Sequence, residues 1–321
     1  MQRYISVILL SLFCCSCQND VDIISLTEPS TFVYSILDLS DSIHYIRINK
    51  SFICYDNAYN YVKYPDSLYY NQIDVSVELT HLNSDKIDLK ADSLNYKPKD
   101  SGLFASEPNI LYSFSYDLRD YSSAKLTLVI SELSDTITAT TPIVNHGKFL
   151  LPGIWSSSKK ISFFSGSYDM HWRVGTGFFN SMSYTFHYRD FLETQIVPME
   201  FDYEFQHDLT KGGERDFSIL LADFLYTVKS RIPNIPDVKC RIFDSIDFHM
   251  VTADEFLYNY SRMLMYDPPE NSLLSMTNIN NGFGIFSSRS KIDYTGMRLD
   301  KQALDSLEKS LTTRHLKFVQ Y

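Results

Sequence analysis

The sequence lacks the short motifs that usually announce catalysis or metal binding. It has no His-Glu-x-x-His segment, no Walker-type phosphate loop, no Gly-x-Ser-x-Gly elbow and no pair of Cys-x-x-Cys motifs. Its 8 histidines include no pair at the i, i+4 spacing of a helical zinc site. We therefore predict a protein with no catalytic residue, no cofactor and no metal.

The segment Tyr168–Trp172 (YDMHW) is the best candidate for a metal site. Asp169 and His171 lie two residues apart, which places both side chains on one face of a strand. Such a pair can ligate a metal, but a polar pair on an edge strand explains the same pattern without a ligand. We favour the second interpretation, so the sequence assigns no binding residue.

Basic residues are also in short supply. The chain has 29 Lys and Arg against 39 Asp and Glu, for a formal net charge of −10. A nucleic-acid-binding protein needs a basic patch or stripe, so the composition argues against nucleic acid as a partner. Tryptophan is scarce, with 2 residues, whereas 23 Tyr and 22 Phe are present. Abundant aromatics in alternating segments favour strands over helices.

Cysteine is too scarce for a scaffold held together by disulfides. Three of the 5 cysteines lie close together near the N-terminus, at positions 14, 15 and 17. The other two, Cys54 and Cys240, fall in what we predict to be different domains. We therefore interpret each of them as a single buried thiol that behaves as a small apolar residue.

Long apolar runs are absent except near the N-terminus. The run from Tyr4 to Cys15 is shorter than the ~20 residues that a membrane-spanning helix needs. A basic start at Arg3, a short apolar segment and small residues after it are typical of a secretory signal. Ser16, a small residue directly before Cys17, matches the cut made by lipoprotein signal peptidase. We predict that residues 1–16 are removed and that Cys17 carries the lipid.

Two alternatives stay open, because Cys14 stands where lipoprotein signals usually carry an aliphatic residue. They are a plain secretory signal cut nearby and an N-terminal membrane anchor. With lipidation, residues 17–27 form a short polar tether, and the lipid is the link to the membrane. Asp20 and Asp22 partly match the surface-export signals of Bacteroidota lipoproteins. We expect the outer membrane, on its periplasmic side or at the cell surface.

Residues 28–145 show the alternation of half-buried strands. In the segment Ile73–Leu82, the residues Ile73, Val75 and Val77 share one face while polar residues occupy the other. About seven such segments predict an immunoglobulin-like or fibronectin-like β-sandwich. The predicted strands are Thr31–Leu37, Ile43–Asn49, Ile73–Leu82, Lys86–Lys90, Leu111–Leu118, Lys125–Ser131 and Asp135–Thr141.

Residues 146–321 mix strands and helices, which predicts a β-rich α+β domain with about three helices. The strands are expected at Ser183–Asp190, Phe201–Gln206 and Arg241–Met250. A helix is expected over Arg215–Ile232, ended by Pro233, because apolar residues from Phe217 to Val228 recur at three and four. Thr252 and Glu255 form a capping box for a second helix, and a third begins at Asp300.

The segment Cys54–Asn71 is rich in tyrosine and is predicted to be a long loop. Its tyrosines are at positions 55, 59, 61, 64, 69 and 70. Exposed tyrosines supply stiff contact area with a polar tip, which suits a glycan, a peptide or a protein partner. The alternative, which we prefer, is that several of them pack back onto the sandwich.

Three segments together resemble a known family. They are Phe32–Phe52 (FVYSILDLSDSIHYIRINKSF), Tyr64–Tyr70 (YPDSLYY) and Thr277–Ser290 (TNINNGFGIFSSRS). They are similar to uncharacterised Bacteroidota cell-envelope lipoproteins, a domain of unknown function with an N-terminal β-sandwich. The resemblance implies an envelope protein beside TonB-dependent uptake systems and no catalytic residues. In the last segment, Gly282 and Gly284 share a strand face, which predicts close internal packing there.

The function expected from these observations is that of a non-catalytic lipoprotein of the cell envelope. It would bind a glycan or peptide ligand, or an outer-membrane protein partner in nutrient uptake. The first alternative is a structural or adhesive surface protein. The second is an extracellular hydrolase, which two carboxylates facing each other across a cleft would favour.

Overall fold

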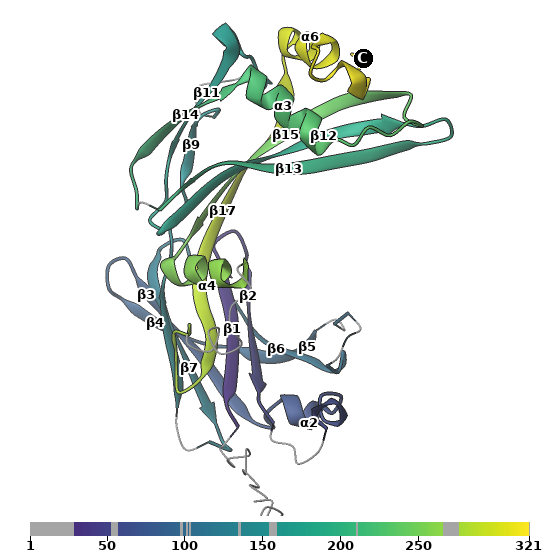
Figure 1. Ribbon diagram of the computed structural model, residues 1–321. Coiled ribbons are helices and arrows are strands. Elements are labelled where there is room, and N and C mark those ends of the chain that lie inside the picture. The colour runs from purple at the N-terminus through teal and green to yellow at the C-terminus, as the bar shows by residue number, and fades with distance from the viewer. Residues whose placement is uncertain are drawn as a thin grey trace, which may run out of the picture.

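The structure is a computed structural model that describes residues 29–52, 57–96, 99–100, 102, 104–133, 136–153, 159–209, 211–265 and 276–320. The predicted leader and tether (1–27), with Cys17, and also Cys54 lie outside these residues. Figure 1 shows two β-rich parts arranged end to end, with β17 (Phe283–Leu299) running through both. The predicted fold class, mostly β with some α, is confirmed.

The lower part in Figure 1 is a sandwich of two sheets. One sheet has the order β16-β8-β7-β3-β4, and the other contains β17, β1, β2, β6 and β5. Alternate side chains of both sheets enter a shared core, among them Val33, Val77 and Leu126, each at most 1% exposed. The strands are β1 (Thr31–Asp38), β2 (Ile43–Lys50), β3 (Ile73–His81), β4 (Lys86–Lys90), β5 (Asp92–Tyr96), β6 (Asn109–Ser115), β7 (Tyr121–Ile130), β8 (Ile137–Pro142) and β16 (Ile279–Asn280).

The upper part combines a long antiparallel sheet with a smaller one. The long sheet has the order β13-β12-β15-β17, the small one β14-β11-β9, and a second buried cluster lies between them with Trp172 and Phe186 at its centre. The strands are β9 (Lys148–Leu151), β10 (Lys160–Ile161), β11 (Ser167–Arg173), β12 (Phe179–Phe191), β13 (Ile196–Asp208), β14 (Glu214–Leu220) and β15 (Cys240–Ala253). The helices are α2 (Pro65–Leu68) in the lower part, α4 (Glu255–Met265) near the junction, and α3 (Leu221–Arg231) and α6 (Lys301–Lys309) in the upper part.

Strand β17 joins the two parts because its two halves have different partners. Phe283–Arg289 pair in parallel with Phe32–Asp38 of β1. Arg289–Met297 pair antiparallel with β15. The N-terminal sandwich is therefore completed by a segment from near the C-terminus, which comes after most of the upper part in the sequence. Two residues of that segment, Ile279 and Phe286, belong to the buried cluster of the sandwich.

A buried carboxylate, Asp254, ties three elements together at this junction. It is 2% exposed and accepts hydrogen bonds from the Thr141 hydroxyl of the β8 strand at 2.7 Å and from the Ser287 hydroxyl of β17. It also accepts the Leu257 backbone N–H at 2.8 Å and so caps helix α4. Such a fully partnered carboxylate satisfies buried donors that would otherwise destabilise the fold.

Two helix starts differ from those that the sequence predicts. The helix predicted over Arg215–Ile232 begins only at Leu221, because Glu214–Leu220 pair with β11 as strand β14. The predicted cap Thr252 lies inside β15, and Asp254 caps the helix instead. The start at Asp300 is confirmed, since its carboxylate accepts the Ala303 N–H at 2.8 Å. Among the described residues, no helix is long and apolar enough to span a bilayer.

Candidate functional site

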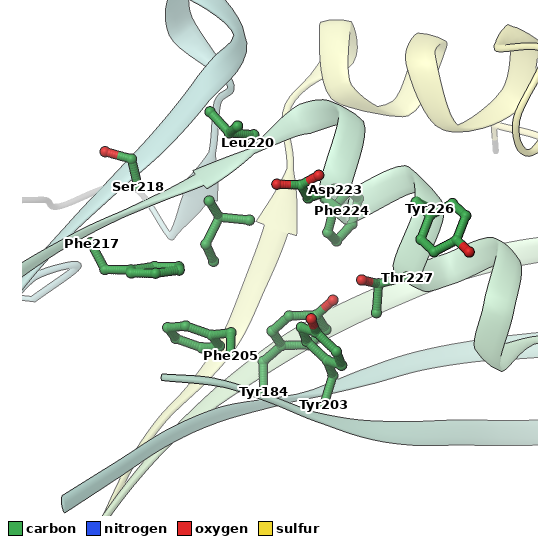
Figure 2. Close-up of a pocket in the computed structure, with 11 residues that line it drawn as sticks. Tyr184, Tyr203, Phe205, Phe217, Ser218, Leu220, Asp223, Phe224, Tyr226 and Thr227 are labelled. Atoms are coloured by element: carbon green, nitrogen blue, oxygen red, sulfur yellow. The ribbon is translucent and has the colours of Figure 1, made fainter. Parts of the chain in front are cut away.

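A pocket of about 200 Å³ opens in the upper part, between helix α3 and strand β14 on one side and strands β12 and β13 on the other (Figure 2). Its lining is mostly aromatic, with a few hydroxyl groups and one carboxylate. The described residues that line it are Tyr184, Tyr203, Phe205, Phe217, Ser218, Ile219, Leu220, Asp223, Phe224, Tyr226 and Thr227. The volume is below the ~300 Å³ at which pockets begin to hold drug-sized molecules, so it suits a single ring.

The aromatic side of this pocket arises from the alternation of side chains along strand β13. Along β13, Phe201, Tyr203 and Phe205 project on the same side, toward the upper core. Tyr203 pairs in register with Tyr184 of β12, and their ring centroids are 5.6 Å apart. Phe205 in turn lies 5.3 Å from Phe217 of β14. The four rings form a continuous aromatic surface across two sheets.

The Tyr184 hydroxyl is the unusual group of the site. The residue is 2% exposed, and the hydroxyl is buried without a hydrogen-bond partner of acceptable geometry among the described residues. Burial raises its pKa, Tyr203 adds to the rise, and the neighbouring Thr227 hydroxyl and Arg231 guanidinium lower it only in part. A buried hydroxyl without a partner costs ~1–3 kcal/mol, and such groups are rare in native proteins. The polar group that stands beside it is the Thr227 hydroxyl, with which it interacts.

Two further polar groups, on Asp223 and Thr227, come from the opposite wall, whereas Ser218 points away from the aromatic rings, as Figure 2 shows. Asp223 stands in the first turn of α3 and is exposed, and Thr227 lies one turn later on the same helix. Ser218 of β14 donates its hydroxyl to Asp169 at 2.6 Å. The site thus offers aromatic faces for stacking and a few fixed donors and acceptors, which is the composition of a small-molecule binding site.

The arrangement does not supply a catalytic pair. Among the described residues that line the pocket, Asp223 is the only one with a carboxylate. Glycoside hydrolysis in most families requires two carboxyl groups ~5–10 Å apart, one of them a general acid. The lining also contains no histidine or cysteine.

The two residues of the sequence-based metal candidate, Asp169 and His171, are bonded to different side chains in the structure. His171 Nδ1 lies 2.6 Å from Asp216 and its Nε2 lies 3.2 Å from Glu214. The hydrogen bond to Asp216, with the charge of both carboxylates, raises the pKa of His171. Asp169 instead accepts from Ser218. In the described part of the chain, no group of three or more His, Cys, Asp or Glu side chains is arranged to hold a metal ion.

The tyrosine-rich segment divides between the two interpretations. Tyr69 and Tyr70 are each 7% exposed and pack on the sandwich, with the Tyr70 hydroxyl 2.7 Å from that of Thr31. Tyr59 and Tyr64 are each 62% exposed. Tyr55 lies outside the described residues. Packing against the sandwich is confirmed for the end of the segment, and its middle presents rings to solvent.

The two remaining sequence-based expectations concern glycine and cysteine. A Cβ atom on Gly284 would lie 2.0 Å from the carbonyl oxygen of Val33, so the expected close internal packing is confirmed and the packed group is the backbone of β1. Cys240 is a free thiol, partly buried rather than fully so.

Sequence reasoning did not find the aromatic pocket. Phe217, Asp223 and Thr227 were expected on one amphipathic helix, which would have placed Phe217 in a helix core rather than in a pocket wall. The one available signal is the alternation Phe201-Tyr203-Phe205, which repeats aromatics on one face of a strand. That alternation indicates an aromatic surface but says nothing of what stands opposite.

Comparison with known proteins does not identify a ligand or an activity for this site. No protein family matches the chain, and no curated protein matches it. Structural similarity was found to a DUF4785 family protein from Legionella pneumophila, with 9% identity, 69% of this chain and 50% of that one covered, and a TM-score of 0.21. A second is the C-terminal globular domain of oligosaccharyltransferase from Pyrococcus abyssi, with 10% identity, coverage of 84% and 48%, and a TM-score of 0.18.

A third similar structure is CBD12 from CALX1.2, at 10% identity, coverage of 81% and 98%, and a TM-score of 0.18. The chain spans about half the length of the first two proteins. Similarity at this level carries no argument about function, which therefore has to be argued from the site itself.

Proposed function

We propose that this protein is a non-catalytic, lipid-anchored binding protein of the cell envelope, and that the aromatic pocket holds a single sugar ring of a glycan ligand. The observation that carries the proposal is the aromatic lining of the pocket, where the rings of Tyr184, Tyr203, Phe205 and Phe217 stand together opposite polar groups of helix α3. A sugar ring has an apolar C–H face that stacks on aromatic side chains and hydroxyl groups that complete hydrogen bonds. The Asp223 carboxylate and Thr227 hydroxyl are further partners for those hydroxyls.

Binding of such a ligand is expected to be weak, so the assay has to detect low-affinity binding. A sugar ring of about a dozen non-hydrogen atoms, at roughly −0.3 to −0.5 kcal/mol per atom, gives a Kd between millimolar and tens of micromolar. Saturation-transfer NMR with a panel of monosaccharides and a panel of capped dipeptides covers this range. Signals from the ring C–H face of one or more sugars support the proposal. Binding of dipeptides alone, or of neither panel, would contradict it.

The variant Tyr184→Phe separates a ligand-binding role from a structural one. It removes a hydroxyl that has no good partner in the protein, so we expect the free energy of unfolding to stay the same or to rise. The affinity for the sugar should fall about tenfold, since one hydrogen bond of ~1–1.5 kcal/mol is lost. Urea unfolding and NMR titration measure the two quantities.

The matched control is Tyr70→Phe, because the Tyr70 hydroxyl has a buried partner, Thr31, at 2.7 Å. This variant should lose ~1 kcal/mol of stability and keep its affinity for the sugar. If Tyr184→Phe is destabilised as much as this control and still binds normally, the hydroxyl has only a structural role.

The proposed location rests on the N-terminal residues and on the resemblance to Bacteroidota envelope lipoproteins described above. The protein loses residues 1–16, carries its lipid on Cys17 and is retained at the outer membrane, where it assists nutrient uptake. Intact-mass measurement of the native protein should give a chain that starts at residue 17 with added diacylglycerol. The variant Cys17→Ser should lose the lipid and leave the membrane fraction. A retained leader, or an unmodified Cys17, would overturn the location.

A further inference from the structure

An open groove of about 510 Å³ lies at the lower end of the sandwich, in the part of the molecule that does not contain the sugar pocket. It is bounded by the start of β1, the end of β2, helix α2 and residues between β5 and β6. Figure 1 shows α2 at this end, where β1 begins. The apolar lining residues are Phe32, Tyr34, Phe52, Leu68 and Phe104, and the charged ones are Arg47, Lys50 and Lys99.

The charge of this groove is opposite to that of the chain as a whole. The described lining holds three cations and no carboxylate, whereas the chain carries a net charge of −10. None of the ion pairs among the described residues involves these three side chains. Arg47 projects from the outer face of β2, whereas Lys50 lies on the other face of that strand, with its Nζ 5.3 Å from the Tyr70 ring, and so stands at the rim of the groove with its charge kept. The groove therefore attracts anions.

Exposed aromatic side chains surround the cations. Tyr34 is 39% exposed and Phe104 is 52% exposed. The neighbouring segment that carries α2 adds Tyr59 and Tyr64, each 62% exposed. Aromatic rings mixed with Lys and Arg are the composition of surfaces that sit at the boundary between lipid headgroups and water.

The path of the chain brings this groove to the membrane. The first described residues are joined to its wall, since the Ser30 N–H donates to the Ser51 hydroxyl at 2.8 Å and the Ser51 N–H donates to the Ser30 carbonyl at 2.8 Å. Ser51 lines the groove. The chain between Cys17 and Ser30 spans at most roughly 45 Å when fully extended. A lipid on Cys17 therefore holds this end of the sandwich within roughly 45 Å of the bilayer, which is within reach of its surface.

We propose that the groove docks the sandwich onto the anionic phosphate headgroups of the membrane that holds the lipid, an inference that rests on the proposed lipidation. Arg47 and Lys99 bind headgroup phosphates in the groove, Lys50 binds one at its rim, and the exposed rings enter the interfacial layer. The lipid and the groove then bind the same membrane surface. Because they are linked by one short tether, the affinity of the protein for the membrane is far higher than that of either contact alone. Docking at this end leaves the other end of the molecule, with the sugar pocket, facing away from the membrane.

The test uses the lipid-free chain that starts at Gln18, which keeps every residue of both buried clusters. It is mixed with vesicles of phosphatidylcholine containing 30% phosphatidylglycerol, or with pure phosphatidylcholine vesicles, and sedimented. We expect binding to the anionic vesicles only, and release at high salt as the charges are screened. The triple variant Arg47→Gln/Lys50→Gln/Lys99→Gln should lose binding on the order of a hundredfold, about fivefold per cation.

The matched control removes three cations from the upper part, as Lys148→Gln/Lys301→Gln/Arg314→Gln. These side chains are exposed, and they lie on β9, α6 and the turn after α6. Because the change in net charge is the same, equal losses in both variants would show non-specific attraction and overturn the proposal. No binding to anionic vesicles, or equal binding to both vesicle types, would overturn it as well. Thermal unfolding of both variants verifies that they fold.

Failure of this test is distinct from failure of the proposed function. The vesicle assay contains no lipidated protein and no sugar, so its result does not depend on Cys17 or on the aromatic pocket. If free inorganic phosphate at millimolar concentration competes fully with the vesicles, the groove is a phosphate site rather than a membrane-docking surface, and the proposal is wrong.

Discussion

Replacing Arg241 by Met should destabilise the upper part of the protein by about 3–5 kcal/mol, the cost of leaving a buried charge without its partner. Arg241 is 1% exposed, and its Nε donates to Asp190 at 2.7 Å. Its other nitrogens donate to the carbonyls of Leu316 and Pro233, each at 2.9 Å. The substitution removes all of these donors and leaves the Asp190 carboxylate buried and alone.

The measurement is urea unfolding followed by tryptophan fluorescence. Both tryptophans lie after residue 146, and Trp172 is 2% exposed in the upper core, so the signal reports the part of the molecule that Arg241 stabilises. The C-terminal segment should also become accessible to proteases, because the lost Arg241 guanidinium donates to the Leu316 carbonyl at 2.9 Å and so holds this segment in place. The expected shift is several-fold larger than that of an ordinary surface substitution.

Two control variants test whether the loss of stability comes from the buried charge of the Arg241–Asp190 pair. Arg173→Met breaks an ion pair with Glu214 at 2.6 Å whose side chains are 60% and 44% exposed, so it should change stability by less than ~1 kcal/mol. The double variant Asp190→Leu/Arg241→Met removes both buried charges and should regain much of the lost stability. A single Arg241→Met variant as stable as wild type would show that the pair is not the stabilising contact inferred here.

Replacing Gly284 by Ala should disrupt the sandwich. A Cβ atom at this position would lie 2.0 Å from the Val33 carbonyl oxygen, and the backbone has φ +110. An alanine in this backbone conformation is strained by ~1–3 kcal/mol. The clash of its Cβ atom with the β1 backbone costs a further ~1–3 kcal/mol or more. The sum approaches the free energy of unfolding of a marginally stable domain. Because β1 and β17 pair in parallel at this point, relief requires the two strands to separate.

Gly212→Ala is the matched control for this variant. Gly212 also has a positive φ, +64, but nothing lies within 4 Å of its Cβ position. It should therefore show only the conformational cost, ~1–2 kcal/mol. Near-ultraviolet circular dichroism of the tyrosine-rich sandwich, followed through urea unfolding, compares the two. Equal, small losses in both variants would mean that the β1–β17 contact yields more easily than its geometry indicates.

Local patterns predicted most of the strands correctly, because alternation of apolar and polar residues is a property of the strand itself. β4 was predicted to the residue at Lys86–Lys90, and β2 to within one residue. β5 was missed because its only partly buried side chain is Leu94, so it shows no alternation. The aromatic pocket was missed for a different reason: it requires α3 and β14 to stand opposite β12 and β13, and no local period encodes that contact.

By itself, the sequence determined the mostly β fold class, the position of most strands and the cap of the last helix, since each of these depends on neighbours along the chain. It also carries the N-terminal pattern on which the proposed anchor depends. Only the tertiary structure decided that β17 completes the first sandwich and enters the second sheet, that Tyr184 meets a pocket, and that three cations gather beside the start of β1. Those features arise from pairing between segments hundreds of residues apart, and that pairing is selected by the burial of whole faces rather than by local preference.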